Sequence, residues 1–239
     1  MSKVRGNGMI CVWTDINQPV EEEFNTWYEE EHMPERVNEV PGIISARRYT
    51  CIEGDPKHLA VYDLEDPSAL ESEEYKGITQ RNSPGTQKMM PNFLNTVRNI
   101  YSEILEAGAP PEQDTEYMLG IRLNIAPEND ALFNSWYNED HLPALGAVEG
   151  VRYARRFKMV ESAPSVQPSP GSSDVDSDKL FDGTQNAHTY LALYEMDSLE
   201  IMETEDWKNA AGYGRTAQVR PLFKDVKRNI YKLIFSIKK

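Results

Sequence analysis

The chain has 239 residues, 39% of them hydrophobic, which is enough to bury a core of domain size. Its formal net charge of −14 argues against nucleic acid and anionic membranes as partners, because both require basic surface patches. No stretch approaches the roughly 20 apolar residues of a membrane span, and the first eight residues lack the apolar core of a signal peptide, so we expect a cytoplasmic protein.

One block of the sequence occurs twice. Residues 24–34 read FNTWYEEEHMP and residues 133–143 read FNSWYNEDHLP, and shorter matches follow in the same order. Such internal repetition predicts two copies of one unit. We assign residues 1–106 to the first copy and 117–239 to the second, with a polar linker at 107–116. The second copy carries an insertion near 161–186, rich in Ser, Pro and Asp, which we expect to be a mobile loop or a lid.

The predicted elements of each copy follow one another in the same order. Residues 9–16 (and 118–125) form a strand, and residues 20–31 an amphipathic helix expected to end near Pro34. One helix face carries Val20, Phe24, Trp27, Tyr28 and, in its middle, Glu31. The remaining predictions are strands at 42–52 and 58–64 around a turn, a short acidic helix from Pro67, and a last strand at 97–105.

This β-α-β-β-α-β order is that of a ferredoxin-like unit. One such sheet leaves an apolar face that needs a partner, and two units in one chain supply it to each other. The sequence therefore predicts an α+β fold in which two antiparallel sheets pack into one intramolecular barrel with the helices outside.

The motif Trp-Tyr-x-x-x-His-x-Pro, found at positions 27–34 and 136–143, resembles that of the EthD-like branch of the dimeric α+β barrel superfamily. The superfamily includes cofactor-independent monooxygenases, polyketide cyclases, lactone isomerases, lyases and haem enzymes. Its members usually form the barrel from two chains, whereas here tandem fusion would form it within one. The resemblance implies a small-molecule substrate, and the protein would be either a monomer or a homodimer.

Two acid–histidine pairs are the main catalytic candidates, Glu31-His32 and Asp140-His141. Imidazole titrates near neutrality and suits general-base work, and a nearby carboxylate would orient it. In the alternative interpretation, each His caps its helix or bonds a main-chain carbonyl, and each acid bonds an arginine such as Arg47 or Arg155.

Other side chains are candidates for substrate contact. Strand alternation places the two arginines of each Arg-Arg pair on opposite faces of the sheet. The inward arginine either holds an enolate or forms a salt bridge. The aromatic residues either pack helix against sheet or line a pocket for a flat substrate. The candidates are Trp27, Tyr28, Arg47, Tyr62, Trp136, Tyr137, Arg155 and Tyr194.

The two copies differ at Trp13 and Asp15, where the second has Arg122 and Asn124, so the two pockets are not equivalent. Cys11 and Cys51 are expected to be reduced and buried. There is no Gly-rich phosphate loop, no metal-ligand spacing among the four His, and no Cys cluster, so we expect neither metal nor cofactor.

We therefore predict a cofactor-independent enzyme acting on a small aromatic or polyketide-like substrate. His32 or His141 would abstract a proton, Tyr and Arg side chains would stabilise the anion, and cyclisation, elimination or isomerisation would follow. One alternative is a cofactor-independent monooxygenase in which the substrate carbanion reduces O2. Another is a non-catalytic small-molecule-binding or scaffold protein.

Overall fold

The computed structural model describes residues 5–81, 83–160 and 188–239, and the predicted insertion lies outside these ranges. The strands of the described residues are β1 (Gly8–Ile16), β2 (Ile43–Glu53), β3 (His58–Leu64), β4 (Phe93–Gly108), β5 (Tyr117–Ile125), β6 (Val151–Met159), β7 (Tyr190–Met196) and β8 (Phe223–Lys238). The α-helices are α1 (Glu21–Trp27), α2 (Met33–Glu39), α3 (Glu73–Arg81), α4 (Pro84–Met89), α5 (Asp130–Trp136), α6 (Leu142–Gly146), α8 (Glu205–Gly212) and α9 (Thr216–Val219). None of the described helices is long and apolar enough to cross a membrane.

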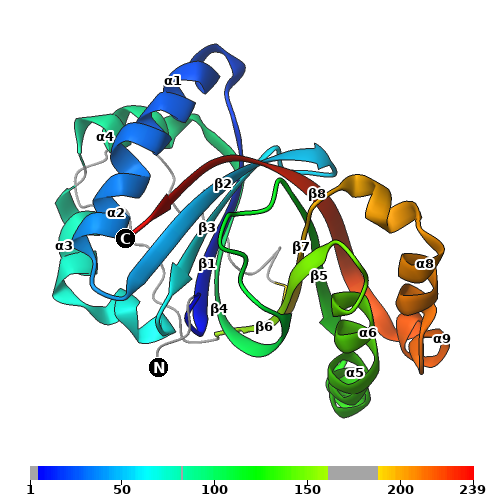
Figure 1. Cartoon of the computed structure of the whole chain (residues 1–239). Coiled ribbons are helices and arrows are strands. Elements are labelled where there is room, and N and C mark those ends of the chain that lie inside the picture. The colour runs from blue at the N-terminus through cyan, green and yellow to red at the C-terminus, as the bar shows by residue number, and fades with distance from the viewer. Residues whose placement is uncertain (1–4, 82, 161–187) are drawn as a thin grey trace.

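The strands close into one antiparallel barrel in the order β1-β3-β2-β8-β5-β7-β6-β4. Each half contributes four neighbouring strands in the ferredoxin-like order, β4-β1-β3-β2 and β8-β5-β7-β6. The halves join edge to edge through the pairs β2–β8 and β4–β6. The predicted α+β fold with an intramolecular barrel is thereby confirmed. Figure 1 shows α1–α4 covering one side of the barrel, with α5, α6, α8 and α9 covering the other.

β4 and β8 hold the two halves together because each crosses from one to the other. Both have 16 residues, and β8 pairs first with β5 and then with β2 (Figure 1). Near its end, β8 packs Phe235 and Ile237 against the first half's core, and β4 packs Leu105 and Ala107 against that of the second. The strand predicted at 97–105 is therefore shorter than β4. The two ends of β4 lie against different neighbours, so a single alternation of apolar and polar residues does not extend along the whole strand.

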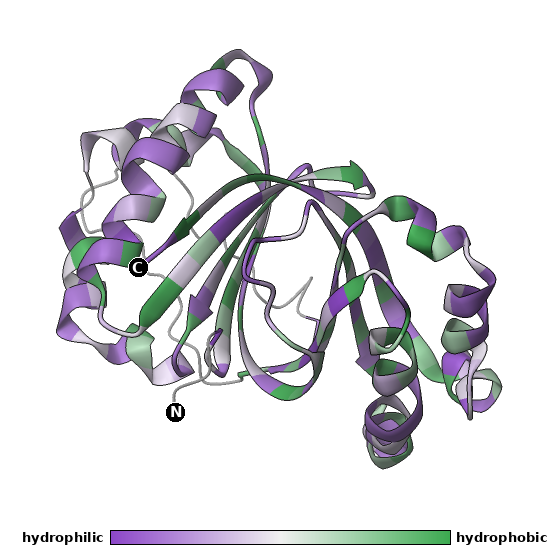
Figure 2. Ribbon diagram, viewed as in Figure 1, coloured by the Kyte–Doolittle hydropathy of each residue, from purple (hydrophilic) through white to green (hydrophobic). Residues whose placement is uncertain are grey.

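The apolar side chains form three cores. One fills the barrel with residues such as Trp13, Tyr101 and Tyr231, and the other two lie between each sheet and its own helices. The covering helices show mixed colours in Figure 2, as expected for elements with one apolar face. The alternation at Arg47-Arg48 follows this division, since Arg47 contacts acids inside the barrel while Arg48 lies over the ring of Phe24 from α1.

The first helix was predicted to end near Pro34. It continues instead to Glu39 through a π-helical segment, η2 (Tyr28–His32). The second half repeats this with η6 (Tyr137–His141). A π turn holds one more residue than an α turn, so it gives room to the proline ring, which would otherwise clash with the preceding turn's carbonyl. The wider turn also shifts the helical period, which explains why Glu31 is exposed rather than on the apolar face.

Candidate active site between the helices and the sheet

The two predicted catalytic histidines occupy equivalent places at the ends of the π segments. The ring centroid of His32 lies 4.3 Å from that of Trp27 and 4.7 Å from that of Tyr28. The ring of His141 lies 4.4 Å from Trp136 and 5.1 Å from Tyr137. Among the described residues, neither buried Nδ1 atom has a hydrogen-bond partner. The alternative in which each histidine caps its helix is wrong, because the helices continue past His32 and His141.

Both imidazoles are neutral at neutral pH. Burial lowers the pKa of His32 well below its usual range, and the charges of Arg36 and Arg48 lower it further. Burial, with a smaller contribution from Arg220, lowers the pKa of His141 to about 4. A neutral imidazole is the form that accepts a proton.

The neighbouring acids do not form dyads with these histidines. Glu31 accepts hydrogen bonds from the Trp27 indole (3.3 Å) and the Ser83 hydroxyl (2.5 Å). Asp140 accepts from Arg215 through Nε (2.8 Å), and this contact lowers the pKa of Asp140. The alternative in which an acid bonds an arginine therefore holds for Asp140, but the partners named for it, Arg47 and Arg155, are wrong because both lie inside the barrel.

Each histidine contacts the tyrosine of its own π segment, Tyr28 or Tyr137, and that tyrosine lies beside one on the outer face of the sheet, Tyr62 or Tyr194. In the second half the hydroxyls of Tyr137 and Tyr194 are hydrogen-bonded at 3.1 Å. In the first half the hydroxyl of Tyr62 is close enough to Tyr28 to influence its pKa, yet it is buried without a hydrogen-bond partner of good geometry among the described residues. Burial raises the pKa of Tyr62 and of Tyr194 well above the usual range.

Each half places one arginine of the sheet beside its phenols, Arg48 in the first and Arg156 in the second, and the first half adds two further cations. The charge of Arg36 acts on the pKa values of His32, Tyr28 and Tyr62 alike. Arg98 donates a hydrogen bond of 2.9 Å to the Tyr75 hydroxyl, and its charge also acts on Tyr28.

The corresponding second-half positions are less polar. Leu145 replaces Arg36 and Trp207 replaces Tyr75, whereas Arg228, the counterpart of Arg98, pairs with Glu53. Arg36, Tyr75 and Arg98 were not among the predicted site residues. The contrast between Arg36 and Leu145, four positions after each histidine, was the available signal.

The aromatic pairs that recur in the two motifs pack helix against sheet. Trp27, Tyr28, Trp136 and Tyr137 are between 1% and 6% exposed. Arg48 lies over the Tyr28 ring at 4.8 Å and Arg156 over that of Tyr137 at 4.6 Å. A flat substrate would therefore meet the edges of this layer rather than an open aromatic wall.

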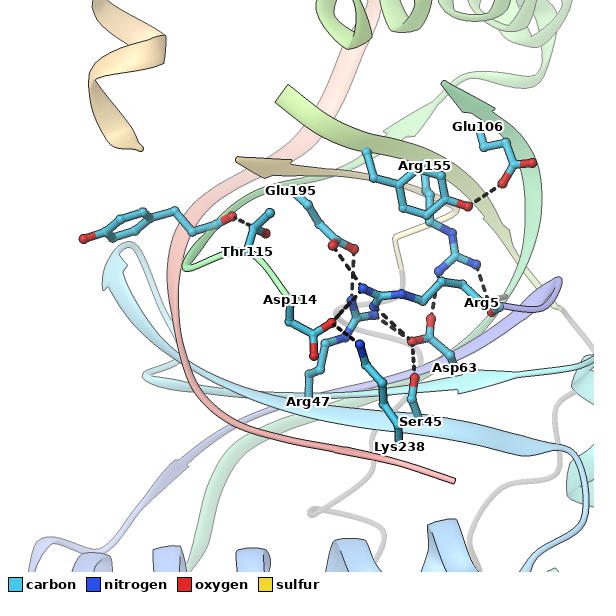
Figure 3. A network of polar contacts seen from close by, with 12 residues as sticks. Arg5, Ser45, Arg47, Asp63, Glu106, Asp114, Thr115, Arg155, Glu195 and Lys238 are labelled. Atoms are coloured by element: carbon cyan, nitrogen blue, oxygen red, sulfur yellow. Dashed lines mark hydrogen bonds and ion pairs between the residues drawn. The ribbon is translucent and has the colours of Figure 1, made fainter. Parts of the chain in front are cut away.

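Arg47 and Arg155 point into the barrel, where they join a buried ion-pair network (Figure 3). Arg47 donates to Asp63 (2.8 Å) and Glu195 (3.0 Å). Arg155 donates to Asp63 (2.8 Å) and Glu103 (2.7 Å). The salt-bridge interpretation thus describes both arginines, and a substrate could contact either one only if an ion pair opened. Burial raises the pKa of Glu195.

Among the residues that the structure describes, no group of three or more His, Cys, Asp and Glu side chains is arranged to hold a metal ion. Cys11 and Cys51 are free thiols; Cys11 is buried and Cys51 is half-buried.

Comparisons with solved structures identify the fold. The chain superposes on an anthrone oxidase-like protein with a TM-score of 0.61 at 13% identity, covering 98% of this chain and 93% of the other. A candidate monooxygenase of Fusobacterium nucleatum matches with a TM-score of 0.60 at 10% identity, over 98% and 95% of the two chains. Chlorite dismutase of Candidatus Nitrospira defluvii matches with a TM-score of 0.57 at 8% identity, over 95% and 91%. No protein-family model and no curated protein matches the sequence. The chain therefore has the fold of the dimeric α+β barrel superfamily.

Proposed function

We propose that the protein is an enzyme that removes a proton from a small aromatic carbon acid, at the first-half site formed by His32, Tyr62 and Arg36. The observation that carries the proposal is a pair of buried polar atoms, His32 Nδ1 and the Tyr62 hydroxyl, that have no hydrogen-bond partner of good geometry among the described residues and lie beside the charge of Arg36. Buried polar groups are rarely left without partners, so such a pair suits a bound molecule that supplies them.

Each group has a distinct role in the proposed step. The neutral imidazole of His32 accepts the proton, and the Tyr62 hydroxyl donates a hydrogen bond to the oxygen on which negative charge develops. The low pKa of His32 makes it a weak base, so the reaction depends on stabilisation of the anion. Arg36 and Arg98 supply positive charge for this purpose, whereas in the second half Leu145 replaces Arg36 and Arg228, the counterpart of Arg98, pairs with Glu53.

The fate of the carbanion distinguishes two forms of the proposal. The likeness to an anthrone oxidase-like protein and to a candidate monooxygenase favours transfer of its electrons to O2. For anthrone, deprotonation at the methylene carbon and reaction with O2 would give a hydroperoxide, which loses water to yield anthraquinone. Cyclisation, elimination or isomerisation would begin with the same proton transfer but consume no O2. From the repeated motif we also propose that the chain belongs to the EthD-like branch and that it arose by tandem fusion.

The test is turnover of anthrone, followed by oxygen uptake and by anthraquinone absorbance. Deuterium exchange at the methylene carbon under nitrogen reports the proton step alone. We expect His32→Ala to lower the rate about 10²- to 10⁴-fold, and His141→Ala, the matched variant in the other half, to change it little.

Other outcomes would move the site, select between the two forms of the proposal, or contradict it. Loss of activity in H141A with normal turnover by H32A would move the site to the second half. Exchange without oxygen uptake would select the cyclase or isomerase form. Binding of anthrone with neither exchange nor oxidation would favour the non-catalytic alternative.

A further inference from the structure

One arginine inside the barrel has no counter-ion among the residues that the structure describes. Arg5, Arg47 and Arg155 each lie within 4.0 Å of at least two carboxylates. Arg122, from β5, is only 3% exposed, yet no described acid lies within ion-pair distance of it. A buried and unpaired charge is costly, so it calls for an explanation.

The immediate neighbours of Arg122 are neutral. Its guanidinium lies 4.0 Å from the centroid of the Trp13 ring and donates a hydrogen bond of 3.3 Å to the Asn229 amide oxygen. The nearest acid along β1 on the same face is Asp15, but it accepts instead from the Lys57 main-chain N–H (2.8 Å) and Asn95 (2.9 Å).

A second hydrogen-bond donor lies in the same layer of the barrel. The Tyr231 hydroxyl, 1% exposed, accepts from the Trp13 indole at 2.9 Å, and its own proton has no acceptor among the described residues. The charge of Arg122 acts on Tyr231, which shows that the two are close. A guanidinium has five N–H donors, and Arg122 uses one of them in a described hydrogen bond. A cation and a phenol therefore share unused donors beside an indole ring.

We propose that Trp13, Arg122 and Tyr231 form a second ligand site, which takes the carboxylate of a small aromatic acid. A carboxylate matches the planar fork of a guanidinium, and Trp13 and Tyr231 offer aromatic contacts to the ring that carries it. The site lies within the barrel, because Trp13 and Tyr231 belong to its core. It is thus separated from the proposed active site by the sheet, and the inference does not rest on the proposed function.

The test uses benzoate as the probe and benzamide as its neutral analogue, with binding to the full chain measured by calorimetry. We expect benzoate to bind and benzamide not to bind. Arg122→Gln should weaken benzoate binding at least about tenfold, as loss of a charge-assisted contact implies. The matched control is Arg152→Gln, the same change at an arginine that is 58% exposed, and it should leave binding unchanged. Arg36→Leu should also leave it unchanged, because Arg36 belongs to the other site.

Stability supplies a readout that does not depend on the probe. If Arg122 serves a ligand, R122Q should melt at the same or a higher temperature than the wild type in benzoate-free buffer, because the unpaired charge is gone. Should R122Q fail to fold, Tyr231→Phe carries the binding test, with an expected loss of several-fold. Absence of benzoate binding by the wild type, equal binding by R122Q, or loss of binding in R36L alone would overturn the proposal.

Discussion

Equivalent tyrosines in the two halves differ in how their hydroxyls are satisfied. Tyr194 shares a hydrogen bond with Tyr137, whereas Tyr62 has no partner of good geometry among the described residues. Removing a buried hydroxyl that is hydrogen-bonded costs about 1 kcal/mol, and removing one that is not costs little. We expect Tyr194→Phe to lower the free energy of unfolding by about that amount and Tyr62→Phe to leave it unchanged or raise it.

Urea unfolding of the two variants measures this difference in stability. Anthrone turnover by the same variants measures the effect on activity. Y62F should lose activity without losing stability, which is the pattern of a residue kept for function. Equal destabilisation by the two substitutions would show instead that Tyr62 has a structural partner.

His141 makes the stability of the fold dependent on pH. Its pKa is about 4 in the folded protein and near 6.5 when unfolded, so between these values only the unfolded chain binds the proton. Stability is therefore complete above pH 6.5 and is lost as the pH falls toward 4. At pH 5 the loss from this residue should be about 2 kcal/mol relative to pH 7.5.

The measurement is the change in unfolding free energy between pH 7.5 and pH 5, in wild type and in His141→Gln. Carboxylates contribute to both proteins, so the difference between them isolates the histidine. An identical loss in the two would mean that His141 titrates normally in the folded state.

At the residue level, the sequence predicted the aromatic and histidine residues of the candidate site but not their partners. Strand alternation correctly predicted that the two arginines of each pair lie on opposite faces of the sheet, but it did not say which one faces the barrel. It carried no information on Glu195, which lies 148 positions from Arg47 and bonds it only because β2 and β7 belong to one closed barrel. Arg36 was missed because a charged residue on a helix is most often solvated.

At the level of elements, the π segments hold His32 and His141 against their tryptophans. Because a π turn contains one extra residue, deletion of an exposed residue within it can be absorbed by contraction to an α turn. We expect deletion of Glu30, in η2, to leave a folded protein with a modest loss of stability. It should still abolish activity, since His32 rotates relative to Tyr62. Circular dichroism, thermal melting and anthrone turnover measure these effects.

The matched control is deletion of Thr26, which is also exposed but lies in the regular α-helix α1. There no extra residue is available, so Phe24 would rotate by about 100° relative to Trp27 and the first-half core would be lost. Comparable destabilisation by the two deletions would count against an absorbing role for the π turn.

The elements themselves were predictable to different degrees. Strand β3, at His58–Leu64, has the bounds predicted from sequence, because it lies between two neighbours of its own half along its whole length. The helix predicted to end near Pro34 continues, since the rule that proline ends a helix assumes an α turn before it. β4 exceeds its prediction at both ends, because its first residues pair with β1 of its own half and its last residues pair with β6 of the other half.

For the whole molecule, the repeat defines an approximate two-fold relation, and the residues near its axis are complementary rather than identical. Arg155 of the second half bonds Asp63 of the first, and Arg47 of the first bonds Glu195 of the second, so these contacts are exchanged between halves. Arg5 and Asp114, which occupy equivalent positions, bond each other at 2.8 Å. In a pair of identical halves, this position would bring two like charges together, which is unfavourable.

This arrangement predicts that the two charges can be exchanged. Arg5→Asp alone would place an acid beside Asp63, Glu195 and Asp114, and Asp114→Arg alone would crowd Arg5 and Arg47. Each change leaves an uncompensated buried charge and should cost about 3–5 kcal/mol. In the double variant, an arginine at position 114 would reach Glu195 and Asp63 from the other side of the axis, so most of the stability should return.

Urea unfolding of the four proteins gives the coupling energy of the pair. Exchanging the exposed pair Arg152 and Asp197, which are 58% and 43% exposed, is the control and should change stability by less than about 1 kcal/mol. If the double variant at positions 5 and 114 were as unstable as the sum of its single changes, the network would depend on these particular side chains. Recovery would show instead that opposite charges across the axis are sufficient, and that the two halves have diverged to fit each other rather than copies of themselves.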